Sequence, residues 1–315
     1  MVNSTNKYMK NMKKYRFILV LFTIITFSSC HVVDPMSGEQ YEKNIYIIGA
    51  YNKVSSFNVL YGNEESAFVS ISASGTKKVD KNIEVILKQN DDLIEWYNNK
   101  YMLDQPVKYQ QLDPELIQVP SWSTILTAGE IYTRLPFTVN TKGLHCDSLY
   151  AISFEIESVS DYQIEELGKE LIFTLKLSNE FSGFYHMDAT KIMLREETLP
   201  DGSTEWVEQG LAVPTSTQRA LTAVSENELR FFHDKTKETL AEYSNSWDPG
   251  KEYFDAIEKY CIVLKKGEDN KFTIDSWKDM KIIEGEAEYS VGMFSFWYDF
   301  TEGNNRYRMQ GVFRK

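Results

Sequence analysis

Aromatic side chains in the second half of the chain are the first candidates for chemistry. The flat rings of Trp and Tyr can pack against the C–H faces of sugar rings, while nearby Asn, Asp, Gln or Arg groups bond hydroxyls. Trp247 lies with Tyr243 and Asn245 in the segment YSNSWDPG, whose composition is typical of a loop. An exposed aromatic residue in a loop indicates a binding role. Trp206 is the second candidate, with edge or core packing as its alternative. Trp297 lies in an alternating aromatic strand, so we expect it in a core.

Carboxylates are plentiful, with 46 Asp and Glu residues, but this abundance makes any single pair uninformative. A glycosidase needs two carboxyl groups held across the scissile bond, one of them with a raised pKa. The sequence singles out no such pair. We therefore assign no catalytic residue and expect a non-enzyme.

Metal-binding and nucleophile motifs are also missing from the sequence. The four histidines are far apart, and neither H-E-x-x-H, a Cys pair at ligand spacing nor G-x-S-x-G occurs. In His145-Cys146-Asp147, neighbours on a strand would point to opposite faces. We expect no metal and no cofactor. Cys146 and Cys261 are expected to be buried free thiols, with a bridge between them as the alternative.

Cys30 is a candidate for lipid modification. Basic residues precede the apolar run Phe17–Phe27, which is too short to cross a bilayer, since a span needs roughly 20 residues. Small residues then lead to the cysteine, as in a bacterial lipobox, although Phe27 stands where Leu is usual. We expect a signal peptide over residues 1–30, a lipid anchor on Cys30 and a tether over 31–42, with an ordinary signal peptide as the alternative.

Composition excludes some classes of partner. A net charge of −12 argues against nucleic acid and against electrostatic attraction to anionic lipid. The many aromatic residues and the lack of low-complexity tracts indicate a folded chain. The length suits two domains.

The first half alternates with period two and has turn residues between the runs, which predicts an immunoglobulin-like β-sandwich over residues 43–178. Examples are Ala67–Ala73 and Glu170–Leu177. One helix is expected near Leu93–Asn98, capped by Asp91 or Asp92, with Leu93, Trp96 and Tyr97 on one side.

Residues 42 to 178 carry spaced features of a known frame, "yN…Y…LP…Y…I.aG". The matching positions are Tyr97, Asn98, Tyr109, Leu112, Ile125 and Gly129, with Leu112-Asp113-Pro114 in place of "LP". This stretch resembles the N-terminal domain of Bacteroidetes surface lipoproteins encoded with glycan-utilisation machinery. The same domain precedes catalytic modules in some endoglycosidases of glycoside hydrolase family 18. Trp96 and Trp122 lie on this frame and are expected to be structural.

The second half predicts an antiparallel β-barrel over residues 179–315, calycin-like, with a jelly roll or sandwich as the alternative. Three hairpins are clear, with turns at 199–202, 267–270 and 302–305. An open sheet would leave long aromatic edges bare. The acidic strand motif of the family 18 enzymes is absent, and roughly 135 residues are too few for a (β/α)₈ barrel.

The resemblance implies a non-catalytic, cell-surface, glycan-binding lipoprotein of the outer membrane. Its expected partners are a glycan, an outer-membrane importer complex and neighbouring glycosidases. Three alternatives remain: a surface adhesion or structural lipoprotein that binds proteins, a carrier of a small apolar ligand inside the barrel, and an unrecognised glycoside hydrolase.

Overall fold

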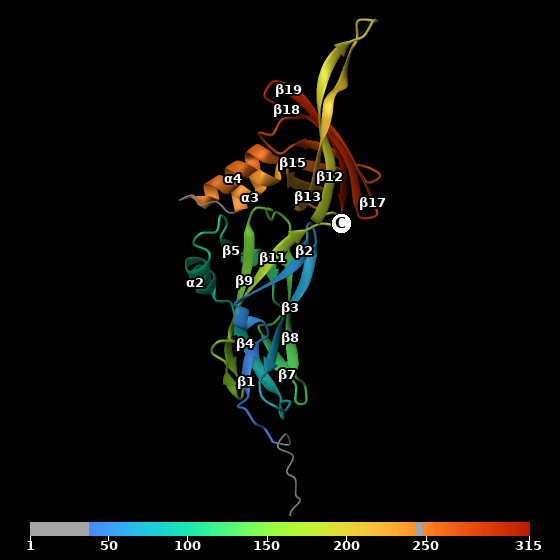
Figure 1. Ribbon diagram of the computed structural model, residues 1–315. Helices are drawn as coiled ribbons and strands as arrows, with labels where there is room; N and C mark the ends of the chain where they lie inside the picture. The colour runs from blue at the N-terminus through green and yellow to red at the C-terminus, as the bar shows by residue number, and fades with distance from the viewer. Residues whose placement is uncertain (1–37, 243–247) are drawn as a thin grey trace, which may run out of the picture.

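Two β-structured bodies lie end to end in the computed structural model, which describes residues 38–242 and 248–315 (Figure 1). The first body is a sandwich of two sheets and the second is a closed antiparallel barrel. The prediction of an all-β chain is confirmed. The predicted signal segment, including Cys30, lies outside the described residues.

The sandwich packs a five-stranded sheet against a six-stranded one. The first sheet has the order β10 (Gln163–Ile164), β1 (Asn44–Ile47), β3 (Glu64–Ala73), β8 (Tyr132–Asn140) and β6 (Ile117–Gln118). The second has β2 (Val54–Leu60), β11 (Glu170–Ser178), β9 (Leu149–Val159), β4 (Ile83–Lys88) and β7 (Ser123–Leu126), with β5 (Tyr109–Gln111) on β9. Alternate side chains of both sheets meet in one core, as period-two patterning dictates.

The predicted helix is α2 (Asp91–Tyr101), which packs on the outside of the second sheet. Its N-cap is Asn90, so the prediction that Asp91 or Asp92 caps it is wrong; these acids lie in the first turn, where they favour the helix dipole. Leu93 and Ile94 are its buried residues. Trp96, expected to be structural, is 42% exposed and packs on Tyr101 of the same helix instead of the sheet.

Asn98 explains part of the recurring frame. Its side-chain amide donates to the Tyr109 carbonyl at 2.7 Å, and the Tyr109 N–H donates back to its oxygen at 3.0 Å. These two bonds tie the end of α2 to β5. Trp122 packs on the sandwich core, as expected.

The barrel closes because its last strand pairs with its first. Its order is β12 (Gly183–Thr198), β13 (Thr204–Ser225), β14 (Glu228–Phe232), β15 (Cys261–Lys266), β16 (Lys271–Ser276), β17 (Ile282–Ser290), β18 (Met293–Glu302) and β19 (Asn305–Arg314). Aromatic side chains from several strands fill the interior, among them Tyr185, Phe231, Phe272, Phe294, Phe296 and Phe313. Closure of the barrel therefore pairs the strand edges that an open sheet of these aromatic strands would leave exposed.

The hairpin of β12 and β13 extends beyond the barrel, at the end of the molecule far from the sandwich (Figure 1). The helices α3 (Lys235–Glu242) and α4 (Pro249–Tyr260) lie between β14 and β15 in the sequence and were not expected. The α4 helix starts at the cap Asp248, whose side chain accepts from the Lys251 N–H at 3.0 Å. Its apolar face packs on Phe232 and Cys261.

A buried ion pair joins the two bodies. Asp147, in the loop before β9, accepts from both terminal nitrogens of Arg230 on β14, one of them at 2.7 Å. The Arg230 guanidinium also stacks on Trp277, 5.0 Å from the ring centroid. Cys146 and Cys261 are both free, and burial raises the pKa of the Cys146 thiol to about 11.

Among residues 38–242 and 248–315, no helix has both the length and the apolar composition that crossing a bilayer requires.

Candidate functional site

Three of the four predicted ligand-binding residues, Tyr243, Asn245 and Trp247, lie outside the described residues. The fourth, Trp206, lies on β13 in the extended hairpin and is 44% exposed. It is therefore a surface residue and not part of the barrel core.

Trp297 was expected in the core, and this prediction is wrong. On β18, Phe294, Phe296, Tyr298 and Phe300 point into the barrel and are buried. Because neighbouring side chains on a strand point to opposite faces, Trp297 lies on the outer face, where it is partly exposed. Ser295 shares that face and is exposed.

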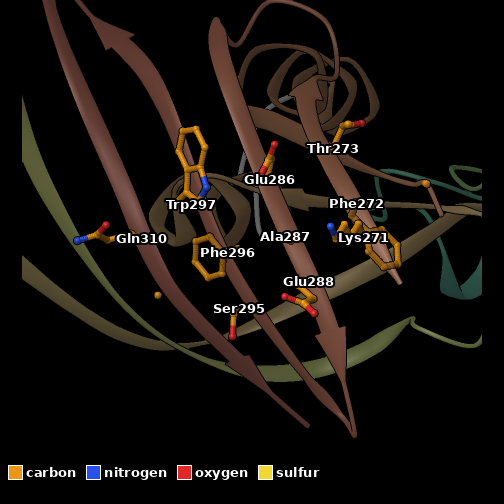
Figure 2. A pocket seen from close by; sticks show the side chains of 12 residues that line it. Lys271, Phe272, Thr273, Glu286, Ala287, Glu288, Ser295, Phe296, Trp297 and Gln310 are labelled. Atoms are coloured by element: carbon orange, nitrogen blue, oxygen red, sulfur yellow. The ribbon is translucent and has the colours of Figure 1, made fainter. Parts of the chain in front are cut away.

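Polar residues of adjacent strands line up with Trp297. Glu286 on β17 and Gln310 on β19 are its direct cross-strand partners, and Glu288 stands opposite Ser295. Figure 2 shows these side chains on neighbouring strands around one hollow. The hollow measures about 640 Å³, and Thr273 and Lys271 on β16 complete its polar lining. Its volume is within the range of small-ligand sites.

A buried carboxylate organises the residues next to Trp297. Asp299 is 0% exposed, although it lies on the outer face, because two arginines of β19 cover it. Arg308 donates to its two oxygens at 2.7 and 3.0 Å, and Arg306 donates to one oxygen at 3.0 and 2.5 Å. These bonds to Asp299 raise the pKa of Arg308.

Each of these two arginines also stacks on a tryptophan. The Arg308 guanidinium carbon lies 4.6 Å from the Trp297 ring centroid, and that of Arg306 lies 4.8 Å from the Trp206 ring centroid. Asp299 therefore holds both guanidiniums, and through them it orients both rings. Preorganised rings lose little freedom when a ligand packs against them. We call Trp206, Trp297, Asp299, Arg306 and Arg308 the tryptophan–arginine network.

A second, smaller hollow of about 380 Å³ lies at the Trp206 end of this network. Arg306 lines it together with Gln209 of β13, Asn304 of the β18–β19 turn and Asn305 at the start of β19. Amide groups there can donate to and accept from hydroxyl groups. The outer face thus has a hollow beside each tryptophan.

This arrangement suits the binding of a polyhydroxylated ligand. Rings, amides, hydroxyls and carboxylates are the groups that hold such a ligand. Glu286 and Glu288 project from one strand to the same side, toward the ring of Trp297 and the other lining residues.

His145, Cys146 and Asp147 are not on a strand, so the expectation that their side chains diverge is wrong. Their possible ligand atoms lie within 4.8 Å of one another, which makes them a potential metal group among the described residues. Asp147, however, is already bonded to Arg230 through both carboxylate oxygens. The ion pair of Asp147 with Arg230, which joins the two bodies, therefore explains the position of Asp147 without a metal ion.

Comparisons with known families match both bodies. A family model described as an N-terminal domain matches residues 41–163, and a model described as C-terminal matches residues 169–314. A search of curated proteins finds no match.

Several solved Bacteroides structures share the fold over nearly the whole chain. A multidomain protein including DUF1735 from Bacteroides ovatus has a TM-score of 0.55 and 15% identity, over 83% of this chain and 89% of that one. A Bacteroides ovatus protein of unknown function has a TM-score of 0.57 and 16% identity, over 87% and 94%. An auxiliary nutrient binding protein from Bacteroides thetaiotaomicron has a TM-score of 0.51 and 12% identity, over 90% and 94%.

Proposed function

From the matches of its two halves to these N-terminal and C-terminal family models, we propose that the chain is a non-catalytic glycan-binding protein of the cell surface. The observation that carries the proposal is the hollow beside Trp297. There a ring oriented by Arg308 stands among the side chains of Glu286, Gln310 and Ser295. The auxiliary nutrient binding function named for one structural neighbour agrees with it.

The proposal includes a lipid anchor on Cys30 and a place at the outer membrane. The first described residues lie at the end of the sandwich opposite the barrel (Figure 1). A tether at that end would hold the sandwich near the membrane and direct the barrel outward. The tryptophan–arginine network would then face long glycans, which an importer complex and neighbouring glycosidases of the same system process.

One of the alternatives fits the structure less well. A carrier of an apolar ligand needs space inside the barrel, but ring contacts such as Phe296 to Phe313, at 4.4 Å between centroids, fill the interior. A hydrolase needs two carboxyl groups that flank the scissile bond, so the assay below measures bond cleavage directly. A protein-binding adhesin uses exposed aromatic residues as well, so experiment must separate it from a glycan binder.

The test is to screen the purified protein against a panel of plant, microbial and host polysaccharides by affinity electrophoresis, with release of reducing ends measured in parallel. We expect retarded migration on at least one polysaccharide and no new reducing ends. Release of reducing ends would favour the hydrolase. Binding to no polysaccharide, together with capture by a surface protein, would favour the adhesin.

A further inference from the structure

The charges around Trp297 bear on which glycans the hollow accepts, an inference that rests on the proposed glycan-binding function. Two arginines beside two tryptophans suggest at first a site for acidic sugars, since a guanidinium binds a carboxylate or sulfate in bidentate fashion. The hydrogen bonds of this network favour a site for uncharged sugars instead. We propose that the hollow selects uncharged glycans and rejects chains rich in uronate or sulfate.

Both guanidiniums are already committed to protein carboxylates. Arg308 makes two bonds to Asp299, and Arg306 bonds both to Asp299 and, at 2.6 Å, to Glu284. Two arginines thus face two acids, and their charges cancel within the sheet. An anionic sugar that recruited either arginine would leave the fully buried Asp299 with an incomplete set of partners, which is costly.

The charges left free at the hollow are mainly negative. Glu286 and Glu288 are both exposed on β17, two residues apart, and both line the hollow. Lys271, the cross-strand partner of Glu288, is the lysine in the same lining. One lysine against two carboxylates leaves the rim acidic, and the net charge of −12 adds to the field that an anionic chain meets on approach.

Neutral hydroxyls meet no such penalty. Carboxylates accept hydrogen bonds from sugar hydroxyls, and the Gln310 amide and Ser295 hydroxyl can both donate and accept. The same carboxylates that repel a uronate can therefore hold an uncharged ring against Trp297. The acidic rim is both an attractive element for neutral sugars and a repulsive one against charged sugars.

The experiment compares a neutral polysaccharide that the purified protein binds with a carboxymethylated derivative of the same polysaccharide, so that only charge differs. Native alginate, polygalacturonate and chondroitin sulfate are tested beside them. We expect the derivative to bind weaker by on the order of tenfold at low ionic strength, with a smaller difference at high salt, because salt screens exposed charges. The acidic polysaccharides should not bind.

The paired variant Glu286→Gln/Glu288→Gln tests whether these two carboxylates cause the weaker binding of the carboxymethylated derivative. It should bind the derivative nearly as well as the neutral parent, whereas Trp297→Ala should weaken both. Stronger binding of alginate, polygalacturonate or chondroitin sulfate that depends on Trp297 would overturn the neutral-ligand inference and leave the glycan-binding function standing. An unchanged preference in the Gln variant would likewise overturn it. Binding to no polysaccharide at all would contradict both the neutral-ligand inference and the proposed glycan-binding function.

Discussion

His233 is a half-buried histidine directly after β14, and its ring contacts the core of the barrel. Its Nδ1 lies 2.8 Å from the Tyr298 hydroxyl, and its ring packs on Phe300 at 4.5 Å between centroids. Burial lowers the pKa of His233 to about 4 from an ordinary 6.5. The folded protein therefore keeps this ring neutral, while the unfolded chain takes up a proton below about pH 6.5.

The stability of the folded state should therefore fall as pH drops from about 6.5 to about 4, and His233 should add no further loss below that. The expected contribution is about 3 kcal/mol at most, from the size of the pKa shift. Urea unfolding at pH 7.5 and 4.5 measures it, with His233→Gln as the comparison. The variant shares all the carboxylates, so it should lose less stability over this interval. Equal losses in both proteins would show that His233 is not the group responsible.

Arg219 is a buried cation with few partners. It is 3% exposed, its Nε and Nη1 have no hydrogen-bond partner among the described residues, and its Nη2 reaches only the His233 carbonyl at 3.5 Å. Burial lowers the pKa of Arg219. Glu238 and Asp234 attract this charge only at a distance, since no ion pair to Arg219 is found in residues 38–242 and 248–315. A buried charge without a close partner is destabilising, so Arg219→Met should raise the free energy of unfolding by about 1–3 kcal/mol. Urea unfolding checks this beside Arg195→Met, an exposed control expected to change little. A loss of stability in Arg219→Met would mean that the guanidinium has a stabilising role.

Of the described site residues, the sequence predicted Trp206 and did not predict the others. Trp206 was a candidate because it is an aromatic residue with polar neighbours. Trp297 was assigned to the core because its strand is rich in aromatic residues. The alternation of side chains along the strand indicates the opposite face. Ser295, Trp297 and Asp299 share one face, and a face with Ser and Asp is the outer one. Arg306 and Arg308 could not be linked to Asp299 until the pairing of β18 with β19 was known.

Among the strands, β12 and β19 approach each other unusually closely at Gly311. A methyl group there would overlap the Asp188 carbonyl oxygen and the Ala189 backbone. Gly311→Ala should therefore force the strands apart and lower the free energy of unfolding by about 1–3 kcal/mol, as overpacking does. Thermal or urea unfolding measures the change, and Gly38→Ala, where a methyl group meets no atom within 4 Å, is the control. Equal stability of the two variants would mean that the seam closing the barrel adapts easily.

The hairpins of the barrel were predictable because their turn residues have a mechanism. Gly202, for example, has φ of 86°, which glycine adopts without strain. The α4 helix was missed although its signals were present: Asp248 before Pro249 is a typical start, and Tyr253, Ala256, Ile257 and Tyr260 follow helical spacing. The polar run YSNS directly before Trp247 is typical of a loop, and it stands next to this helix start. The β-rich context outweighed a local signal that was correct.

For the molecule as a whole, Asp147 and Arg230 fix how the sandwich and the barrel meet. Their side chains are 8% and 4% exposed, so removing either partner leaves a buried charge unpaired. Asp147→Leu and Arg230→Met should each destabilise by about 3–5 kcal/mol, while the double variant should lose less than the sum. Denaturant unfolding gives the free energies, and small-angle scattering reports whether the domains change their relative position. Additive losses would contradict a direct coupling between the two residues.

The expectation of two domains came from the chain length and the resemblance of the first half, and neither of these indicated how the two bodies make contact. Asp147 and Arg230 are 83 residues apart, and neither sits in a recognisable motif. Only the folded arrangement brings them together. The same is true of the two tryptophans, which come from different hairpins and meet through Asp299.

Glycan binding by this protein requires that Trp206 and Trp297 form one binding face. The decisive measurement is the affinity of the purified protein for a polysaccharide that it retains in affinity electrophoresis, compared among Trp297→Ala, Trp206→Ala and Trp96→Ala. Trp96 is a matched control, since it is 42% exposed against 44% for Trp206 and lies on α2, in the other body. We expect Trp297→Ala to weaken binding by at least about thirtyfold, or about 2 kcal/mol, Trp206→Ala to weaken it less, and Trp96→Ala to leave it unchanged. Full binding by the Trp206→Ala/Trp297→Ala double variant, or loss of binding only in Trp96→Ala, would contradict the account.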